Sequence, residues 1–363
     1  MSNLRLINLQ FNPFRDITPS LSNNLVWADM KDVKSKISKA YTDCINNSSK
    51  QIILNWGAYG GGKTFSAYYF IKEKSTEKNL QHIYIRCPKD GSKATDEFFK
   101  SIIDYISFEK LQQHINSIIN NHGESALMNF LTPISSREYA KAICLIGSDD
   151  QDISELMNRF LYVGLTKTEL KKLGLAKDIQ TDTDSIKFLA GIISCFIGDG
   201  TFYDGRVVFW IDEMEDLIYY ASKNYKAFSQ VLRDLMDSIS TSFLLFMNFT
   251  LAEGEESTIE LILGGAVWSR VTRKIRYKQF SFENAKDYSL ELLEQSRIDK
   301  KDKAPFNDDV VDTVLNYIPE SALTPREINK HFNSLIAYVI ENDAKIIDTS
   351  LVNSWIAEYN EDN

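Results

Sequence analysis

Residues 51–70 read QIILNWGAYGGGKTFSAYYF, and this stretch decides the fold. The apolar run at 51–56 predicts a buried parallel strand, because it is continuous rather than alternating. GAYGGGKT at 57–64 has the spacing G-x-x-x-x-G-K-[ST], and helical residues follow it. Glycines let such a loop turn so that backbone N–H groups point at a phosphate, and the helix start adds its positive dipole end. The order of strand, loop and helix therefore predicts a phosphate-binding site.

We expect this loop to bind the phosphates of a nucleotide. Lys63 would contact the β- and γ-phosphates, and the Thr64 hydroxyl would ligate Mg²⁺. A glycine-rich loop before a lysine also arises by chance, but here the flanking strand and helix are both predicted. The predicted nucleotide-binding residues are Gly57, Ala58, Tyr59, Gly60, Gly61, Gly62, Lys63, Thr64 and Phe65.

RVVFWIDE at 206–213 is the clearest strand in the chain, and it ends in two carboxylates. Asp212 at the strand tip would hold Mg²⁺ through its water shell, and Glu213 would orient and deprotonate an attacking water. The alternative is a pair of surface acids that open a loop. Glu215 and Asp216 follow, and we expect them to be solvated charges at a helix start. A protein that binds nucleotide only in order to fold would not need Glu213.

The bulk composition is that of a globular protein in a reducing compartment. The chain has 363 residues, 44% of them hydrophobic, which suits two or three compact units and excludes a disordered chain. A net charge of −9 argues against a protein that coats nucleic acid without sequence preference, although it allows a local basic patch. The four cysteines form no paired motif, so neither a disulfide framework nor a zinc site is indicated. No apolar stretch suits a membrane span or a signal peptide, so we expect a cytoplasmic protein that does not associate with membranes.

The rest of the chain predicts an α/β fold in which a parallel-sheet P-loop core carries additional helices. Further strands are predicted at 82–87 and 242–250, with a candidate edge strand at 275–282. Buried strands separated by helices form a parallel sheet that is covered on both faces. Between the second strand and RVVFWIDE the pattern is almost entirely helical, with candidate helices at 95–106, 108–119, 137–146, 153–162, 166–173 and 184–197. We therefore divide the chain into two parts of the core at 1–93 and 201–282, a helical insertion at 94–200 and a helical lid at 283–363.

The order of these motifs resembles that of the AAA+ ATPases, in particular the initiator and origin-recognition type and its bacterial relatives in transposition and phage defence. NWGAYGGGKT resembles their Walker A motif, VVFWIDE their Walker B motif, and SFLLFMNFT their sensor-1 strand. The resemblance covers about 1–90 and 200–363, and the long helical segment between them departs from a minimal core of this family. It implies an AAA+ fold that binds ATP with Mg²⁺ and hydrolyses ATP to ADP and phosphate.

The resemblance also implies nucleotide contacts outside the two Walker motifs. On the sensor-1 strand, Asn248 is the first choice for contact with the γ-phosphate or the lytic water, and Thr250 is the second. LTPREINKHFNSL at 323–335 resembles the sensor-2 helix of a lid, with Arg326 as the nucleotide contact. The alternative for Arg326 is a helix-start arginine in a salt bridge.

AVWSRVTRKIRY at 266–277 resembles the box that carries the arginine finger, the residue that completes a neighbouring subunit's active site. Arg270 is the preferred finger and Arg273 the second choice. Two alternatives remain for these residues, a basic surface edge and contact with nucleic-acid phosphate.

On this resemblance we expect an oligomeric ATP-driven switch or motor that regulates or remodels a nucleic-acid-associated complex, in a mobile-element or anti-phage system. We expect a homo-oligomer, a protein partner that docks on 94–200, and nucleic-acid contact that is indirect or non-specific. Nothing after the lid helices resembles the winged-helix DNA reader of initiators, so sequence-specific recognition would belong to a partner. The alternative is a signalling ATPase of the STAND type, in which nucleotide holds a closed monomer until an input releases it to recruit an effector.

Overall fold

The centre of the molecule is a parallel sheet, as the sequence predicts. The computed structural model describes residues 3–15, 17–21, 25–200, 203–251, 256–344 and 347–362. The parallel strands run in the order β2-β4-β5-β1-β6, so the loop after β1 leaves from inside the sheet. The strands are β1 (Lys50–Gly57), β2 (Leu80–Arg86), β4 (Asp204–Asp212), β5 (Phe243–Thr250) and β6 (Arg273–Tyr277), and the short β3 (Gly198–Asp199) pairs antiparallel with β4.

The candidate edge strand at 275–282 is confirmed as an edge strand, although its bounds differ. β6 ends at Tyr277, pairs with β1 and lies at the end of the strand order. Helix α12 (Phe282–Ser296) already starts at Phe282, because the Ser281 hydroxyl caps it by accepting a hydrogen bond from the Asn284 N–H. The residues from 278 to 281 are therefore a link between the sheet and the lid helices.

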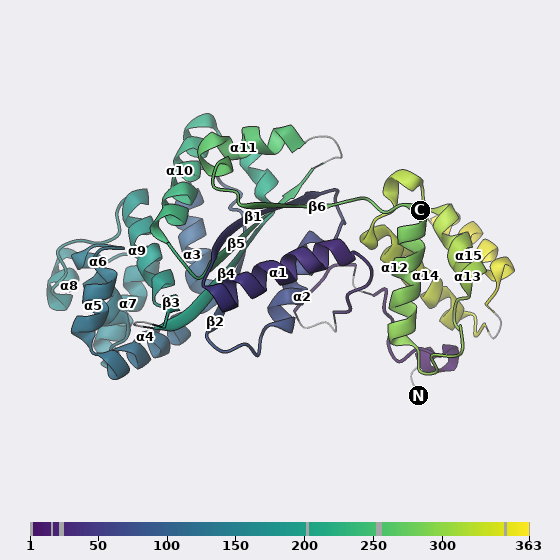
Figure 1. Ribbon diagram of the computed structural model, residues 1–363, viewed down its shortest axis with the longest axis horizontal. Coiled ribbons are helices and arrows are strands. Elements are labelled where there is room, and N and C mark those ends of the chain that lie inside the picture. The colour runs from purple at the N-terminus through teal and green to yellow at the C-terminus, as the bar shows by residue number, and fades with distance from the viewer. Residues whose placement is uncertain are drawn as a thin grey trace.

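Helices cover both faces of the sheet, which explains why its strands are apolar throughout (Figure 1). Two helices pack on the face that buries Val208 and Phe246. A third packs on the opposite face, which buries Phe209 and Leu245. Strands that are buried on both faces require continuous apolar runs, the pattern that β4 and β5 show. The three helices are α1 (Lys31–Asn47) and α2 (Lys63–Glu73) on the first face and α10 (Ser222–Ser238) on the second.

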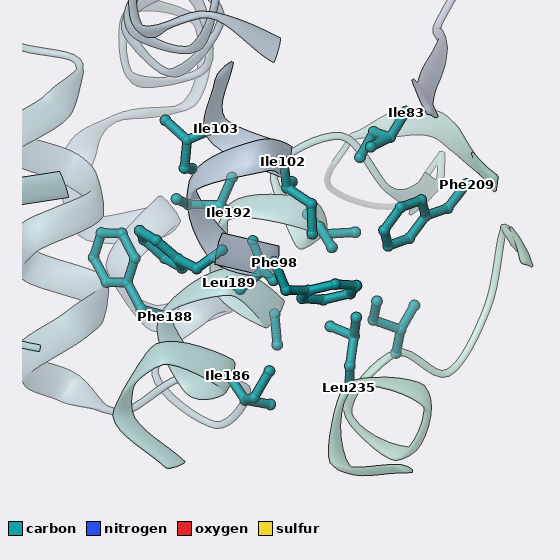
Figure 2. Packing of buried hydrophobic residues seen from close by; sticks show 14 of the residues in the cluster. Ile83, Phe98, Ile102, Ile103, Ile186, Phe188, Leu189, Ile192, Phe209 and Leu235 are labelled. Carbon is teal, nitrogen blue, oxygen red and sulfur yellow. The ribbon is translucent and has the colours of Figure 1, made fainter. Parts of the chain in front are cut away.

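The predicted helical insertion packs directly on this second face and shares its hydrophobic core. Figure 2 shows Phe98 of the insertion among side chains of the sheet, of α10 and of the insertion's last helix. The Phe98 ring centre lies 5.9 Å from that of Phe209 on β4 and 5.5 Å from that of Phe228 on α10. The helices are α3 (Ala94–Ile106), α4 (Phe108–His122), α5 (Glu124–Leu131), α6 (Arg137–Ile146), α7 (Gln151–Tyr162), α8 (Lys167–Leu173) and α9 (Asp182–Ser194). The short α5 is missing from the sequence-based prediction.

The C-terminal helices form a second body with a hydrophobic core of its own. In Figure 1 they lie at the opposite end of the molecule from the insertion. N-terminal residues complete this core: Leu9 is buried in it, and Phe14 stacks on Phe332 with ring centres 4.7 Å apart. The remaining lid elements are α13 (Asp308–Tyr317), η3 (Glu320–Ala322), α14 (Pro325–Glu341) and α15 (Thr349–Asp362), and η1 (Asn3–Ile7) lies against them.

Two further elements follow the strands that end at the predicted site. η2 (Met214–Tyr219) follows β4, and α11 (Glu256–Trp268) follows β5. Within the described parts of the chain, none of the helices combines the length and the apolar character that crossing a bilayer requires.

Candidate nucleotide-binding site

The glycine loop links β1 to α2 and has the backbone geometry that only glycine adopts easily. Gly60 has a φ of 76°, and Gly62, which precedes the first residue of α2, has a φ of 95°. A Cβ atom on Gly57 would lie 2.3 Å from the carbonyl oxygen of Tyr277 on β6, so the neighbouring strand excludes any side chain there. The loop is therefore shaped as a cradle of backbone groups at the start of a helix, which fits an anion such as a phosphate.

Lys63 is buried at the centre of this cradle. Its Nζ donates hydrogen bonds of 2.9 Å to the carbonyl oxygens of Gly57 and Ala58. Burial lowers the pKa of Lys63 to about 8, although the carboxylates of Glu215 and Asp212 oppose the shift. The positive charge of this buried ammonium group is balanced by carbonyl oxygens and nearby carboxylates. Such a group is well suited to bind an anionic ligand.

Asp212 at the end of β4 lies at the glycine loop, against Thr64. The Thr64 hydroxyl donates to Asp212 Oδ2 at 2.6 Å, and the Glu213 N–H donates to Asp212 Oδ1 at 3.0 Å. A second hydroxyl, that of Tyr84 on β2, also donates to Asp212 Oδ2, at 2.8 Å. Tyr84 was not among the predicted site residues.

The oxygen atoms of Thr64 and Asp212 fit Mg²⁺. This ion prefers hard oxygen ligands and is usually held by one or two carboxylates together with substrate phosphates. In the part of the chain that the structure describes, no group of three or more His, Cys, Asp or Glu side chains is placed to hold a metal by itself. A metal at this site would therefore share its ligands with a bound nucleotide.

Glu213 lies beside the metal-ligand candidates and lines the same cavity. Its backbone has a φ of 58°, a left-handed conformation that is uncommon for a residue with a side chain. Its Oε1 lies 3.6 Å from Nε of Arg86 at the end of β2, and the two side chains are 34% and 58% exposed. The carboxylate is thus accessible to water and is restrained by a weak ion pair.

The prediction that Glu215 and Asp216 are solvated charges is wrong. Both are half-buried and line the cavity. Glu215 Oε2 accepts the backbone N–H of Thr250 at 2.9 Å, and burial raises the pKa of Glu215. The reason is that η2 packs over the end of β5. The two acids therefore face the cavity and are not exposed at the start of a helix.

The sensor-1 candidates lie at different depths of β5. Asn248 is fully buried and does not line the cavity; its Oδ1 accepts a hydrogen bond of 2.9 Å from Asn55 Nδ2 on β1. Thr250, two residues further along the strand, pairs in register with Gly57 and lines the cavity. The geometry thus favours the second choice, Thr250, for direct contact with a ligand.

Arg326, at the start of α14, lines the cavity. Its backbone N–H donates to the carbonyl oxygen of Gly60 at 3.4 Å, and its guanidinium carbon lies 4.1 Å from the centre of the Tyr59 ring. The alternative of an ion-paired surface arginine has no support in these contacts. The first turn of α14 therefore covers the glycine loop from the lid side.

The cavity beside the loop has a volume of about 300 Å³, and the sequence-based prediction missed part of its lining. Residues of the N-terminal segment contribute to this lining, and so do Tyr288 and Asn329 of the lid, which are joined by a 3.0 Å hydrogen bond. The segment preceding α1 has no periodicity, so no sequence pattern marked it. The missed N-terminal residues are Ile17, Pro19, Trp27, Ala28 and Met30.

Arg270 and Arg273 do not lie at the cavity of their own chain. Arg270 donates from Nε and Nη2 to the two carboxylate oxygens of Asp237, at 2.7 and 2.6 Å. Arg273 donates to the Lys36 carbonyl oxygen of α1 at 3.1 Å. Arg273 pairs in register with Ile53, at the opposite end of β6 from Tyr277 and the loop. If either residue completes an active site, that site belongs to another subunit.

Comparison with known proteins bears on the fold alone. Neither family models nor curated proteins give a match to this sequence. The Aeropyrum pernix ORC1 protein in complex with DNA is similar in structure, with a TM-score of 0.52 and 11% identity over 93% of this chain and 68% of that one. The Aeropyrum pernix ORC2 protein in its ADP form has a TM-score of 0.55 and 9% identity over 97% and 73%.

A chain of Drosophila ORC bound to DNA gives a TM-score of 0.52 and 10% identity over 99% of this chain and 66% of that one. This chain thus spans about two thirds of the length of the ORC1 and Drosophila chains. The five parallel strands and the many helices agree with this similarity. The chain has the fold of the AAA+ ATPases of the origin-recognition type.

Proposed function

We propose that this chain binds ATP with Mg²⁺ in the cavity between the glycine loop and α14, and hydrolyses it to ADP and phosphate. The observation that carries the proposal is the 2.6 Å hydrogen bond between Thr64 and Asp212, with Glu213 the next residue in the chain. A hydroxyl and a carboxylate in contact beside a buried lysine provide ligands for a metal and a cation for phosphate. The adjacent accessible carboxylate adds a base, which a pure binding site does not need.

Each side chain of the site has a role in this reaction. Lys63 would exchange its bonds to the Gly57 and Ala58 carbonyl oxygens for the β- and γ-phosphates. Thr64 and Asp212 would hold Mg²⁺, which when bound would neutralise charge on the phosphate oxygens. Glu213 would orient the attacking water and accept its proton. Thr250 would contact the γ-phosphate or that water, with Asn248 behind it.

The apolar residues in the cavity lining support the adenine part of this proposal. Trp27 and Met30 offer flat or flexible apolar surface for a purine ring, and Asn329 adds a polar side chain near the lid. Arg326 would meet the phosphates from α14. The nucleotide would therefore contact the N-terminal segment, the sheet and the lid at the same time.

The finer proposal is a homo-oligomeric switch or motor that acts on a nucleic-acid-associated complex. Arg270 and Arg273 lie away from their own cavity, so as fingers they would act on a neighbouring subunit's ATP. The similar ORC1 and Drosophila proteins are DNA-bound, which supports nucleic-acid association here. A protein partner on 94–200, a cytoplasmic location and a mobile-element or anti-phage role complete the proposal and rest on sequence reasoning alone.

The experiment is a measurement of steady-state ATP hydrolysis across a series of protein concentrations, with and without duplex DNA. We expect turnover per subunit to rise with concentration and to rise further with DNA. Glu213→Gln should abolish hydrolysis while ATP binding persists. Activity that survives Glu213→Gln would contradict the assigned base.

The finger variants test whether the site is shared between subunits. Arg270→Ala or Arg273→Ala should remove the dependence of turnover on concentration, because the neighbour's site then lacks its cation. Turnover that is flat for the wild type would instead support a self-contained switch of the signalling type. In that case the contact of α14 with the glycine loop would hold the closed monomer.

A further inference from the structure

Tyr84 belongs to a strand at the edge of the sheet and points toward the predicted metal ligands. β2 pairs in register with β4, so that Tyr84 lies opposite Trp210 and Arg86 opposite Asp212. The Tyr84 side chain is 9% exposed and lies on the face of the sheet that α2 covers. From there its hydroxyl reaches forward along the strands and donates to Asp212 Oδ2 at 2.8 Å.

The Asp212 carboxylate has three hydrogen-bond donors from three parts of the chain. Oδ2 accepts from the hydroxyls of Thr64 on α2 and Tyr84 on β2, at 2.6 and 2.8 Å. Oδ1 accepts the Glu213 N–H at 3.0 Å. Asp212 is 4% exposed, so water contributes little to fixing its rotation. These donors therefore set the plane of the carboxylate.

Tyr84 is the one donor of the three with no other part in the proposed reaction. Thr64 would be a metal ligand, so its hydroxyl has to serve the metal and the carboxylate together. The Glu213 N–H belongs to the backbone turn that follows β4. Without the Tyr84 hydroxyl, Thr64 would be the one remaining donor to Oδ2 among the described residues, and the carboxylate plane would be less firmly held once the metal competes for the Thr64 oxygen.

The Tyr84 ring is itself held in place. Tyr68 of α2 packs against it with ring centres 4.8 Å apart. Packing thus holds the ring of Tyr84, and its hydroxyl donates to the Asp212 carboxylate. Residues outside a metal's ligand set often orient the ligands in this way, and replacing them typically costs 10–100-fold in metal affinity or activity.

We propose that Tyr84 is a positioning residue that acts through Asp212 on the Mg²⁺ and water geometry of the site. The inference rests on the proposed ATPase function. Among the described residues Tyr84 does not itself line the cavity; it reaches the site through Asp212, which does. Its loss should therefore affect the metal requirement and kcat much more than the KM for ATP.

The test compares Tyr84→Phe with Tyr41→Phe, a matched control. Tyr41 is fully buried in the same hydrophobic cluster, and its hydroxyl accepts a 3.2 Å hydrogen bond from Trp210 Nε1 rather than serving the site. Each variant loses one buried hydroxyl and keeps its ring. Thermal unfolding of both variants shows whether they remain folded.

Two measurements are made on the full chain: Mg²⁺ titration of steady-state hydrolysis, and affinity for a fluorescent ATP analogue with Mg²⁺ or with EDTA. For Tyr84→Phe we expect kcat to fall about tenfold, the half-saturating Mg²⁺ concentration to rise, and the gain in affinity that Mg²⁺ provides to shrink. Binding in EDTA should match the wild type. Tyr41→Phe should behave as the wild type in both measurements.

The outcomes separate this inference from the function on which it rests. An active wild type with a Tyr84→Phe variant that is equally active, or impaired in EDTA as much as in Mg²⁺, would overturn the role of Tyr84 alone. Equal losses in Tyr84→Phe and Tyr41→Phe would also overturn it, because they would reflect core packing. A wild type that neither binds nor hydrolyses ATP would overturn the proposed function, and this inference with it.

Discussion

The helical insertion and the C-terminal lid are both helical additions to one sheet, yet they are joined to it differently. Insertion residues and sheet residues belong to a single hydrophobic core, in which Phe98 contacts Phe209 of β4. The lid has a core of its own, completed by Phe14 from the N-terminal segment. Among the described residues, the cavity is lined by lid side chains such as Arg326 and by none from 94–200.

This difference indicates which part of the molecule can respond to nucleotide. The insertion cannot move relative to the sheet without opening a packed apolar core. The lid contacts the glycine loop mainly through the first turn of α14, where Arg326 meets Tyr59 and Gly60. A body with its own core, joined to the rest by this contact and by hydrogen bonds of α12 with Trp27 and Asp29, can rotate as a unit. We therefore expect nucleotide to move the lid and to leave the insertion in place.

The largest expected effect, on the free energy of unfolding, comes from truncating one large side chain in each of the two cores. Phe98→Ala should lower the free energy of unfolding by about 3–5 kcal/mol and weaken the protection of β4 and β5 amides from hydrogen exchange. Phe332→Ala, in the lid core, should destabilise the lid by a similar amount and leave β4 and β5 protected. Hydrogen exchange read strand by strand distinguishes the two. The insertion would be an independent unit, contrary to our account, if Phe98→Ala left β4 and β5 unchanged.

Removing the lid's charge at the cavity should have the next largest effect. Arg326→Ala should weaken ATP binding by about 1.5–3 kcal/mol, the usual contribution of a hydrogen bond to a charged group. Lys330→Ala serves as the control, because Lys330 is an exposed cation on the same helix that does not line the cavity. Titration with a fluorescent ATP analogue gives both affinities. Equal effects of the two substitutions would mean that Arg326 acts only through general charge.

The pH dependence of binding reports on the coupling between lid and loop. The pKa of Lys63 is lowered to about 8, chiefly by burial, and Arg326 contributes to the lowering. Phosphate binds the protonated lysine, and the free protein loses this proton as the pH rises through about 8. ATP affinity should therefore be constant below pH 7 and fall about tenfold per pH unit above 8.

Two variants check the origin of that pH dependence. Lys63→Arg should flatten the profile, because arginine stays protonated throughout this range. Arg326→Ala should move the fall to higher pH, because the neighbouring positive charge is gone. A profile that is unchanged in Lys63→Arg would assign the titration to another group.

The smallest expected effect concerns the strand that leads into the insertion. Arg86 ends β2 and pairs with Glu213 at 3.6 Å, and α3 begins eight residues later, at Ala94. Arg86→Ala should release Glu213 toward the cavity and raise hydrolysis less than about fivefold, because partly exposed ion pairs contribute about 1 kcal/mol or less. Lys93→Ala, an exposed cation in the same link, is the control. A fall in hydrolysis for Arg86→Ala would show that the arginine assists the reaction.

The parts of the site that the sequence predicted are those that lie in one short stretch. The glycine loop and the strand with Asp212 carry their own flanking pattern, so both the fold class and the candidate site at the loop follow from local residues. Asn248 and Thr250 are two residues apart on β5, so their side chains lie on the same face of the sheet. They differ in how close to the cavity end of the strand they lie. That position is set by the register with β1, which no single strand reveals.

The parts that the sequence could not predict depend on contacts between distant segments. Trp27 and Met30 line the cavity because the irregular N-terminal segment crosses it, and irregular segments have no period to detect. Tyr84 reads as an ordinary apolar strand residue until the pairing of β2 with β4 brings it to Asp212. The short α5 buries only Leu127 and Leu131, too few positions to establish a helical period.

The most direct test is hydrogen exchange of the Glu213→Gln variant, measured with and without ATP and Mg²⁺. The variant should bind ATP without turning it over, so that a single state is observed. The account predicts added protection in the glycine loop, the segment around Trp27 and the first turn of α14, with the insertion helices unchanged. No added protection in the glycine loop, or protection that appears first in α4 to α8, would contradict it.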